Sequence, residues 1–371
     1  MSRRVPFVDF KAHVRAIRPE IEAATRRVLD SGWFVLGPEV EAFERELASA
    51  LGAREAVAVA NGTEALQLAL AVRGVGPGDE VITTSLSAAF TGLAVLATGA
   101  RPVFVDVERT TLNLDPRAVA DAVTPRTKAI LPVHLYGHPA DMDPLLVLAA
   151  ERGLAVVEDA CQAHGALYRG RPVGTLEGER GLGALSFYPT KNLGALGDGG
   201  AILVGDPETA DRLRRLRNGG QSDRYRHPEP GLNSRLDEIQ AAILRAGLVH
   251  LAEWTQRRRA LAAAYLEGLR GLVDLALPRE EDYARAVRHL FVVRHPGRDR
   301  LSEALRERGV GTLIHYPIPM HLQPAFGDPG GRLPVVEKAA GEILSLPLYP
   351  EMTDDQVQVV IDAVREALVA L

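Results

Sequence analysis

Between residues 56 and 204, short apolar runs alternate with segments that have the spacing of amphipathic helices. The predicted strands comprise residues 56–60, 79–84, 102–106, 129–134, 154–157, 183–187 and 201–204. Helices are predicted between them, for example at 87–98, 116–123 and 143–152. Strands that alternate with helices form parallel sheets. We therefore expect an α/β fold with a mostly parallel central sheet in a large domain, residues 1–250.

The remaining segments predict two helices before this region and a smaller α+β domain after it, residues 251–371. The predicted helices outside the alternating region lie at 19–30, 38–51, 248–269, 299–308 and from Thr353 to Leu371, with another that follows Arg235. Strands are predicted at 289–294 and 312–314. The polar, glycine-bearing stretch 218–227 is typical of a long loop, and such loops often carry function.

Composition excludes several classes of protein. A net charge of -5 gives no reason to expect a nucleic-acid partner. Cys161 is the single cysteine, which excludes an intrachain disulfide framework and fits a reducing cytoplasm. Residues 1–6 lack the apolar core of a secretory signal, and the uncharged stretch 81–100 contains too many Thr and Ser residues for a good membrane span. We expect a cytoplasmic protein without a membrane partner.

The stretch 184–200, ALSFYPTKNLGALGDGG, places one lysine between apolar residues and a glycine-rich turn. Glycines allow backbone to approach a ligand closely, and apolar neighbours lower an ammonium pKa by desolvation. A neutral lysine amine can form a Schiff base, for which pyridoxal phosphate is the obvious carbonyl partner. The alternative is that Lys191 is an ordinary solvated surface charge.

Pyridoxal phosphate requires a carboxylate beside its ring nitrogen, and Asp159 follows the predicted buried strand 154–157. Ligands of open α/β sheets bind at the carboxyl ends of strands. Two unit charges about 4 Å apart attract by roughly 4 kcal/mol at an effective dielectric of 20, enough to keep the ring nitrogen protonated. Alternatively, Asp159 caps the next helix.

The cofactor phosphate requires hydrogen-bond donors, and the turn Asn61-Gly62-Thr63 leads from a strand into a helix. Helix amino ends have free N–H groups and a favourable dipole. We expect Gly62 and Thr63 to bind the phosphate. The same turn would equally serve as an ordinary helix cap.

Several separated motifs together resemble one known family. They are Asp-x-x-Gln-x-His at 159–164, Ser-Phe-Tyr-Pro-Thr-Lys-Asn at 186–192 and Gly-Asp-Gly-Gly at 197–200, with further matches at 30–33, 37–38, 60–66 and 233–238. This pattern resembles the DegT/StrS family of nucleotide-sugar aminotransferases, which are fold-type I pyridoxal-phosphate enzymes. The resemblance extends over nearly the whole chain.

The resemblance implies roles for individual residues. Lys191 would be the Schiff-base lysine and Asp159 the partner of the pyridine nitrogen, both catalytic. The cofactor-binding residues would be Gly62, Thr63, Ala88, Asp159, Gln162 (to the ring hydroxyl), Ser186 (to the phosphate), Lys191 and Asn233. The residues near the substrate would be His164, Tyr188, Arg235, His315, Tyr316 and His321. Asn233 would reach the cofactor of a neighbouring subunit, which implies a homodimer with shared active sites, or it would cap the helix that follows.

Two positions need separate comment. Many relatives have an aromatic residue that stacks on the cofactor ring where this chain has Ala88, and the nearest aromatic residue is Phe90. Either Phe90 reaches the cofactor ring from a shifted position, or an aliphatic side chain replaces the stacking contact. For Phe90 itself, the interpretation we favour is a core residue of the helix. The His315 and His321 pair lacks a cysteine or acidic residue to complete a metal site, so we expect no metal.

The function implied is amino transfer through pyridoxal phosphate, with pyridoxamine phosphate as the aminated form. The donor would be an amino acid, glutamate by resemblance, and the acceptor a nucleotide-linked keto-sugar. Lys191 would act as general acid and base. The alternatives are another pyridoxal-phosphate reaction on sugars, such as a dehydratase or lyase, and a non-catalytic regulatory protein. Dehydratase relatives replace the lysine, and the presence of Lys191 and Asp159 disfavours a regulator.

Overall fold

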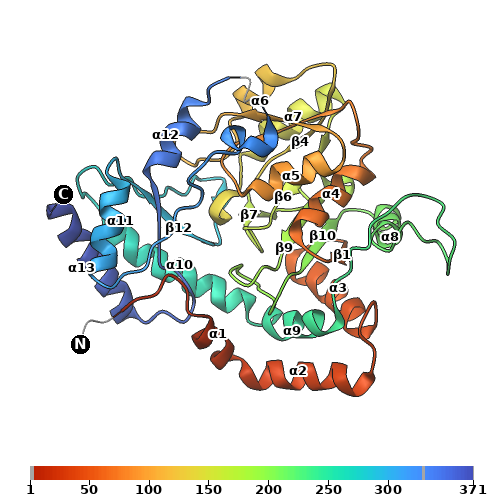
Figure 1. The fold of residues 1–371 in the computed structure, drawn as a ribbon, viewed down its shortest axis with the longest axis horizontal. Coiled ribbons are helices and arrows are strands. Elements are labelled where there is room, and N and C mark those ends of the chain that lie inside the picture. Colours follow the sequence, from red (N-terminus) through yellow and green to blue (C-terminus); the bar gives the residue numbers. More distant parts are fainter. Residues whose placement is uncertain (1–3, 328–330, 371) are drawn as a thin grey trace.

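The computed structural model describes residues 4–327 and 331–370, and its centre is a twisted, mostly parallel sheet (Figure 1). Two four-stranded arrays have the orders β3-β2-β4-β5 and β1-β10-β9-β6. Their strands are β1 (Glu55–Val59), β2 (Glu80–Thr84), β3 (Arg101–Val105), β4 (Thr127–Leu131), β5 (Ala155–Val156), β6 (Glu158–Asp159), β9 (Leu182–Ser186) and β10 (Gly200–Val204). Every predicted strand of the alternating region is present, with bounds that differ by a few residues.

Asp159 joins the two arrays into one surface. Its backbone N–H donates to the carbonyl of Pro132 at 2.8 Å, and its own carbonyl accepts from His134 N–H at 3.0 Å. Strand β10 is antiparallel to both β1 and β9, whereas the pairs β2–β3, β2–β4, β4–β5 and β6–β9 are parallel. The predicted α/β architecture is therefore confirmed, and Asp159 ends a strand near the middle of the sheet.

Helices pack on both faces of the sheet. They are α1 (Phe10–Ala16), α2 (Arg18–Ser31), α3 (Pro38–Leu51), α4 (Gly62–Val72), α5 (Ala89–Ala97), α6 (Pro116–Ala122), α7 (Met142–Arg152), α8 (Pro207–Leu216) and α9 (Glu238–Leu248). Helix α3 shows why its sequence is helical: proline occupies the first turn, Gly52 ends the helix at φ 69°, and Phe43 and Leu47 are fully buried. The Glu238 carboxylate accepts hydrogen bonds from three amides at its amino end.

The C-terminal part has its own small sheet and helices. It contains α10 (Leu251–Gly268), α11 (Arg298–Glu307), α12 (Pro334–Glu342), α13 (Asp354–Val369) and the antiparallel pair β12 (Phe291–Arg294) and β13 (Ile343–Leu346). A separate three-stranded array consists of β7 (Leu167–Tyr168), β8 (Arg171–Pro172) and β11 (Ala284–Arg285). Single 3₁₀ turns are η1 (Leu135–Gly137), η2 (Gly178–Arg180), η3 (Met320–Leu322) and η4 (Pro324–Phe326).

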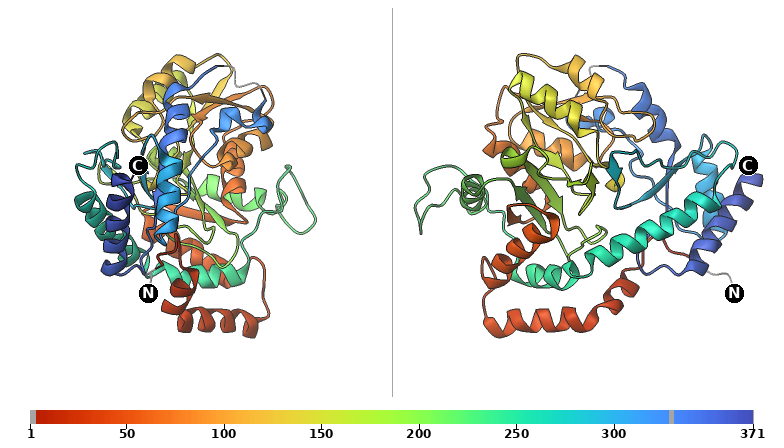
Figure 2. Two further views of the ribbon diagram at one scale, coloured as in Figure 1. Left: turned by 60° about the vertical axis from the view of Figure 1, so that its left-hand side comes forward. Right: turned by 180° about the vertical axis from the view of Figure 1, so that it is seen from behind.

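Helix α10 connects the two parts. It starts beside α9 and runs toward α11 and α13, as Figure 1 and the rear view in Figure 2 show. Trp254 near its start belongs to the apolar cluster under the central sheet, whereas Leu261 and Tyr265 near its end belong to a cluster with α11, β12, β13 and α13. The chain then crosses back: Met320 N–H donates to Ser85 O, and Asp106 caps the start of α12. The C-terminal part thereby reaches the carboxyl edge of β2 and β3.

Some sequence predictions fail here. Residues 312–314 do not form a strand, since Leu313 makes only a single bridge to Ser345. The short helix α1 was not predicted, because seven residues are too few for a clear helical period and none of them is buried. Leu371, the predicted end of the last helix, lies outside the described residues, as do residues 1–3.

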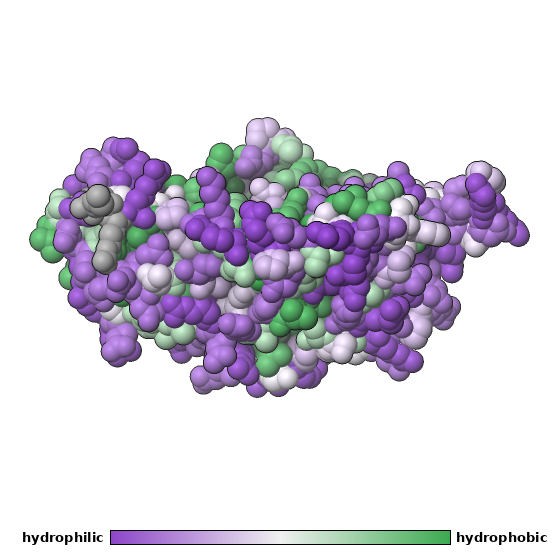
Figure 3. Space-filling view, turned by 90° about the horizontal axis from the view of Figure 1, so that it is seen from below, coloured by the Kyte–Doolittle hydropathy of each residue, from purple (hydrophilic) through white to green (hydrophobic). Residues whose placement is uncertain are grey.

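The surface is mixed in polarity. Figure 3 shows one face as mostly hydrophilic, with apolar side chains in scattered patches. The loop that follows α8 projects away from the body of the molecule in Figures 1 and 2. Within the described ranges, no helix is long and apolar enough to cross a bilayer.

Candidate active site

A cavity of about 890 Å³ lies at the carboxyl edge of the sheet, between the central sheet and the C-terminal part. The sequence-predicted residues that line it are Gly62, Thr63, Ala88, Asp159, Gln162, Ser186, Tyr188, Lys191, His315 and Tyr316. They come from β6, β9 and the turns that follow these two strands, the start of α4, the end of the β2–α5 loop and the segment before η3. The structure therefore gathers most of the predicted site in one place.

Lys191 extends from the turn after β9 into this cavity. Its backbone N–H donates to Tyr188 O at 2.8 Å, which tightens the turn. The same turn admits no side chain at Gly194, because a Cβ there would lie 2.6 Å from Pro189 O. Burial lowers the pKa of Lys191, with Cys161 and Asp159 opposing the shift. The reading of Lys191 as a solvated surface charge does not fit this enclosure.

Asp159 is held at both carboxylate oxygens. Oδ2 accepts a hydrogen bond from Thr91 Oγ1 at 2.8 Å, and Oδ1 accepts one from Cys161 N–H at 3.2 Å. Thr91 in turn lies 3.0 Å from the Ser87 hydroxyl. Asp159 is 4% exposed, so these bonds act in a site with little water. The contact from Thr91 was not predicted, because it joins residues 68 positions apart.

The start of α4 supplies donors at another wall of the cavity. Asn61 caps the helix, since its Oδ1 accepts from Glu64 N–H at 2.9 Å. Helix geometry leaves the amides of Gly62 and Thr63 without intrahelical acceptors. A Cβ at Gly62 would lie 2.7 Å from the Ser186 Cβ, so only glycine allows the two segments to approach this closely. The turn is therefore a helix cap that also leaves amides available for an anion, and phosphate binding by Gly62 and Thr63 stays a prediction.

Gln162 is oriented by two hydrogen bonds. Its Oε1 accepts from Tyr136 N–H at 2.9 Å, and its Nε2 donates to Tyr316 Oη at 3.2 Å. The Tyr136 hydroxyl donates to His315 O. Burial lowers the pKa of His315 to about 4, with the Lys191 charge adding to the shift, so this ring is neutral at neutral pH.

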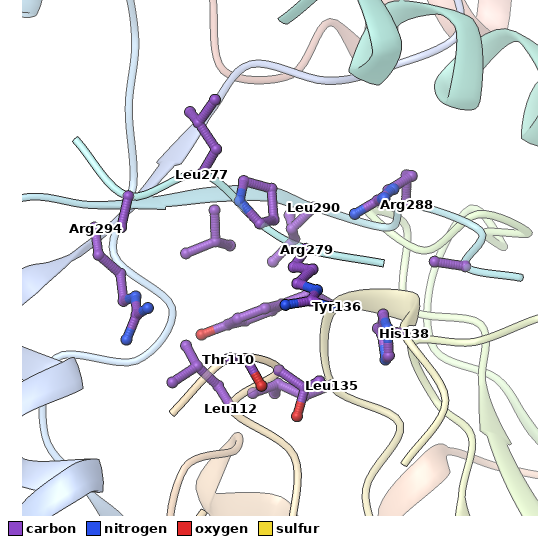
Figure 4. A pocket seen from close by; sticks show the side chains of 15 residues that line it. Thr110, Leu112, Leu135, Tyr136, His138, Leu277, Arg279, Arg288, Leu290 and Arg294 are labelled. Atoms are coloured by element: carbon purple, nitrogen blue, oxygen red, sulfur yellow. The ribbon is translucent and has the colours of Figure 1, made fainter. Parts of the chain in front are cut away.

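Tyr136 also lines a second, much smaller hollow of about 40 Å³. In Figure 4 its ring lies at the centre, with Leu277 and Leu290 above and Leu112 and Leu135 below. Leu290 lines both the hollow and the large cavity. This packing fixes the segment that orients Gln162.

Four predicted residues do not line the cavity of this chain. His164 is buried against Phe187, at 5.7 Å between ring centroids, and burial, with the Lys191 charge, lowers its pKa to about 3. His321 is buried beside the Ser85 hydroxyl, 2.6 Å from its Nδ1. Arg235 donates to Asn218 Oδ1, and Asn233 pairs with Asn218 in an isolated bridge. No cluster of His, Cys, Asp and Glu suited to a metal ion occurs within the described ranges.

Phe90 requires a correction. We favoured a core position, but its side chain is 62% exposed and lines the cavity. Helix α5 starts at Ala89 and buries Thr91, Ala94 and Val95, whereas Phe90 in its first turn lies at the cavity. Ala88 lies just before this helix and lines the cavity without an aromatic ring. Cavity residues that sequence reasoning missed include Phe7, Thr91, Arg258 and Tyr349.

Comparison with known proteins decides the family. The profile of the DegT/DnrJ/EryC1/StrS aminotransferase family matches residues 15–365. The chain belongs to this family. It is 54% identical over 366 residues to the dTDP-3-amino-3,4,6-trideoxy-alpha-D-glucose transaminase of Streptomyces venezuelae, across 98% of this chain and 96% of the relative. It is also 49% identical to the erythromycin biosynthesis sensory transduction protein EryC1 of Saccharopolyspora erythraea, across 97% and 99%.

The fold agrees with this assignment. The crystal structure of S. venezuelae DesV in complex with a ketimine intermediate superposes with a TM-score of 0.96 at 54% identity, and covers 98% of both chains. Members of this aminotransferase family use pyridoxal phosphate, and the chain is a pyridoxal-phosphate-dependent aminotransferase. The residues fit that cofactor: an enclosed lysine, a fixed carboxylate and free helix amides share one cavity.

Proposed function

We propose that this enzyme transfers an amino group from L-glutamate to the keto carbon of a nucleotide-linked sugar. The observation that carries the proposal is that Lys191 and the doubly anchored Asp159 line one large cavity, in a chain 54% identical to a sugar transaminase. The sugar in that relative's name carries its amino group at carbon 3, so we propose a dTDP-linked 3-keto-sugar as the acceptor.

Pyridoxal phosphate, when bound, supplies an electron sink for the carbon that loses or gains the amino group. Lys191 would hold it covalently, because its lowered pKa increases the fraction of neutral amine. The same amine, once released, would move the proton at the reacting carbon. Asp159 would keep the ring nitrogen charged, the amides of Gly62 and Thr63 with Ser186 would bind the phosphate, and Gln162 would contact the ring hydroxyl.

One relative's name favours a second function, since EryC1 is called a sensory transduction protein. A regulator would not need Lys191 and Asp159 at one cavity, and both are present. Turnover decides between the two proposals. The purified enzyme, loaded with pyridoxal phosphate, should release 2-oxoglutarate from L-glutamate when given a dTDP-linked 3-keto-sugar. The same assay with 4-keto-sugars and with sugars linked to uridine nucleotides would define the acceptor. Binding of these sugars without any turnover would support a regulatory function.

We also propose a cytoplasmic homodimer with shared active sites. Three observations support the shared sites. The loop after α8 projects from the body, with Tyr225 82% exposed (Figure 2). Asn233 and Arg235 do not line the cavity of their own chain. Phe90 and Tyr188 at the cavity are largely exposed in a single chain.

Subunit mixing tests the shared sites. Lys191→Ala and Asn233→Ala homodimers should each be inactive, and mixing them should restore part of the activity, because hybrid dimers contain one intact composite site. Sedimentation should show a dimer. A fully active monomer, or mixtures that recover no activity although subunits exchange, would contradict the proposal.

A further inference from the structure

One end of the large cavity contains a buried cation whose hydrogen bonds are incomplete. Arg258 on α10 is 6% exposed and lines the cavity. Its Nη1 donates to His289 O at 3.2 Å and to Leu348 O at 2.7 Å. Its Nε is buried and has no partner among the described residues. A buried donor of a charged group that lacks a partner costs free energy. A ligand that supplies an acceptor to this edge of the guanidinium would remove that cost.

A second unsatisfied donor lines the same cavity. Tyr349, which follows Leu348, is 4% exposed and lines the same cavity, and its buried hydroxyl lacks a partner within the described ranges. Burial, with Asp9 and Glu351 nearby, raises the pKa of Tyr349 to about 12. Its hydroxyl therefore stays protonated at neutral pH and acts as a hydrogen-bond donor. Arg258 Nε and the Tyr349 hydroxyl are therefore two buried donors at one cavity, both electrostatically coupled to Glu351, and neither atom has an acceptor among the described residues.

The carboxylates around this end are engaged elsewhere. Glu351 lies 2.7 Å from His13 Nδ1, and Asp9 accepts from Ala12 N–H at the start of α1. His289 is neutral, because burial, with the charges of Lys191 and Arg258 adding, lowers its pKa well below the usual value. Burial also lowers the pKa of Arg258 to about 10, which leaves it charged at neutral pH. Glu351 acts on Arg258 electrostatically, but no carboxylate of the described residues forms an ion pair with it.

We propose that Arg258 and Tyr349 form a carboxylate-binding subsite for the amino-acid donor, which rests on the proposed amino transfer. With Nη1 occupied by two carbonyls, the Nε edge of the guanidinium remains, and a planar carboxylate can pair with it side-on. His289 lines the same cavity and is electrostatically coupled to both Lys191 and Arg258. A donor carboxylate held there keeps the amino acid within reach of the lysine. The diphosphate of a nucleotide is also an anion that Arg258 could bind. The experiment below distinguishes the donor carboxylate from the diphosphate.

The test follows the two half-reactions separately by cofactor absorbance, with L-glutamate for one and a dTDP-linked keto-sugar for the other. Arg258→Gln should raise the apparent Kd for L-glutamate by about 10- to 100-fold, the loss expected for a charged hydrogen bond. The sugar half-reaction should change less than about twofold. Arg259→Gln is the matched control, since Arg259 on the same helix pairs with Glu280 and does not line the cavity.

A purely structural role for Arg258 predicts equal loss in both half-reactions together with a lower Tm, and this result would overturn the proposal. Selective loss of the sugar half-reaction would show that the subsite binds the nucleotide diphosphate, and this result would also overturn the proposal. Tyr349→Phe removes only a hydroxyl and should weaken the binding of L-glutamate several-fold without changing Tm. This variant provides a test if Arg258→Gln does not fold.

Calorimetry with glutarate keeps this test independent of turnover. Glutarate carries two carboxylates and no amine, so it binds without reacting. The cofactor-loaded wild type should bind it at least about tenfold more tightly than Tyr349→Phe or Arg258→Gln. Equal affinity would refute the subsite even if amino transfer to a sugar is confirmed, whereas a difference would support it even if no sugar is accepted.

Discussion

Replacing Thr91 by valine tests whether Asp159 must be held in place. The substitution keeps the shape of the side chain but removes the hydroxyl that donates to Asp159 Oδ2 at 2.8 Å. Hydrogen bonds to charged groups contribute about 1.5–3 kcal/mol. If that stabilisation keeps the carboxylate aligned during the reaction, kcat should fall by about 10- to 100-fold, since about 1.4 kcal/mol corresponds to tenfold. Oδ1 retains its bond from Cys161 N–H, so activity should not vanish.

Steady-state amino transfer measures this effect, and two further variants define its cause. Thr91→Ser restores the hydroxyl and should recover most of the rate. Thr98→Val is the matched control on the end of the same helix, where the hydroxyl donates to Val95 O and does not line the cavity. If Thr91→Val turned over within about twofold of wild type, or if Thr91→Ser were equally slow, the hydrogen bond would not position Asp159.

Other expected outcomes concern charge and pH. Asp159→Asn should keep the fold but reduce kcat by about three orders of magnitude, the equivalent of roughly 4 kcal/mol for two unit charges about 4 Å apart; a rate near wild type would make Asp159 only structural. Burial raises the pKa of Glu80, but hydrogen bonds from Arg101, Thr124 and Arg126 outweigh this and lower it from 4.5 to about 2. Because the folded-state pKa is depressed, the stabilisation is complete above about pH 5 and is lost as pH falls toward 2. Glu80→Gln should therefore lower the free energy of unfolding by about 1.5–3 kcal/mol at pH 7. Urea titrations should show this difference narrowing as pH falls from about 5 toward 2, whereas a constant difference would contradict the charge argument.

Much of the fold could be predicted because its elements are locally periodic. Helix α3 has both its apolar stripe and its terminal signals within 14 residues, and its predicted bounds match the structure. The failures occur where order depends on distant partners. Leu313 lies in an apolar, strand-like sequence but forms only an isolated bridge to Ser345. Strand β13 was not predicted, because its four buried residues directly follow α12.

The site shows the same division. Lys191, Asp159 and Gly62 lie in motifs whose chemistry is contained in a few consecutive residues, and these line the cavity. Thr91, Arg258 and Tyr349 carry no such signal, because their importance comes from long-range approach and burial. Phe90 was misassigned because its exposure depends on the cavity beside the first turn of α5, which is formed by segments distant in sequence.

The most direct test of the proposed function follows nitrogen from donor to acceptor. The enzyme is loaded with pyridoxal phosphate and incubated with ¹⁵N-labelled L-glutamate and a dTDP-linked 3-keto-sugar, and the nucleotide products are analysed by mass spectrometry. Wild type should produce an amino sugar that carries the label, and Lys191→Ala should produce none under multiple-turnover conditions. An unlabelled nucleotide pool with wild type across the panel of keto-sugars, or labelled product at equal rates from Lys191→Ala, would contradict amino transfer at this site.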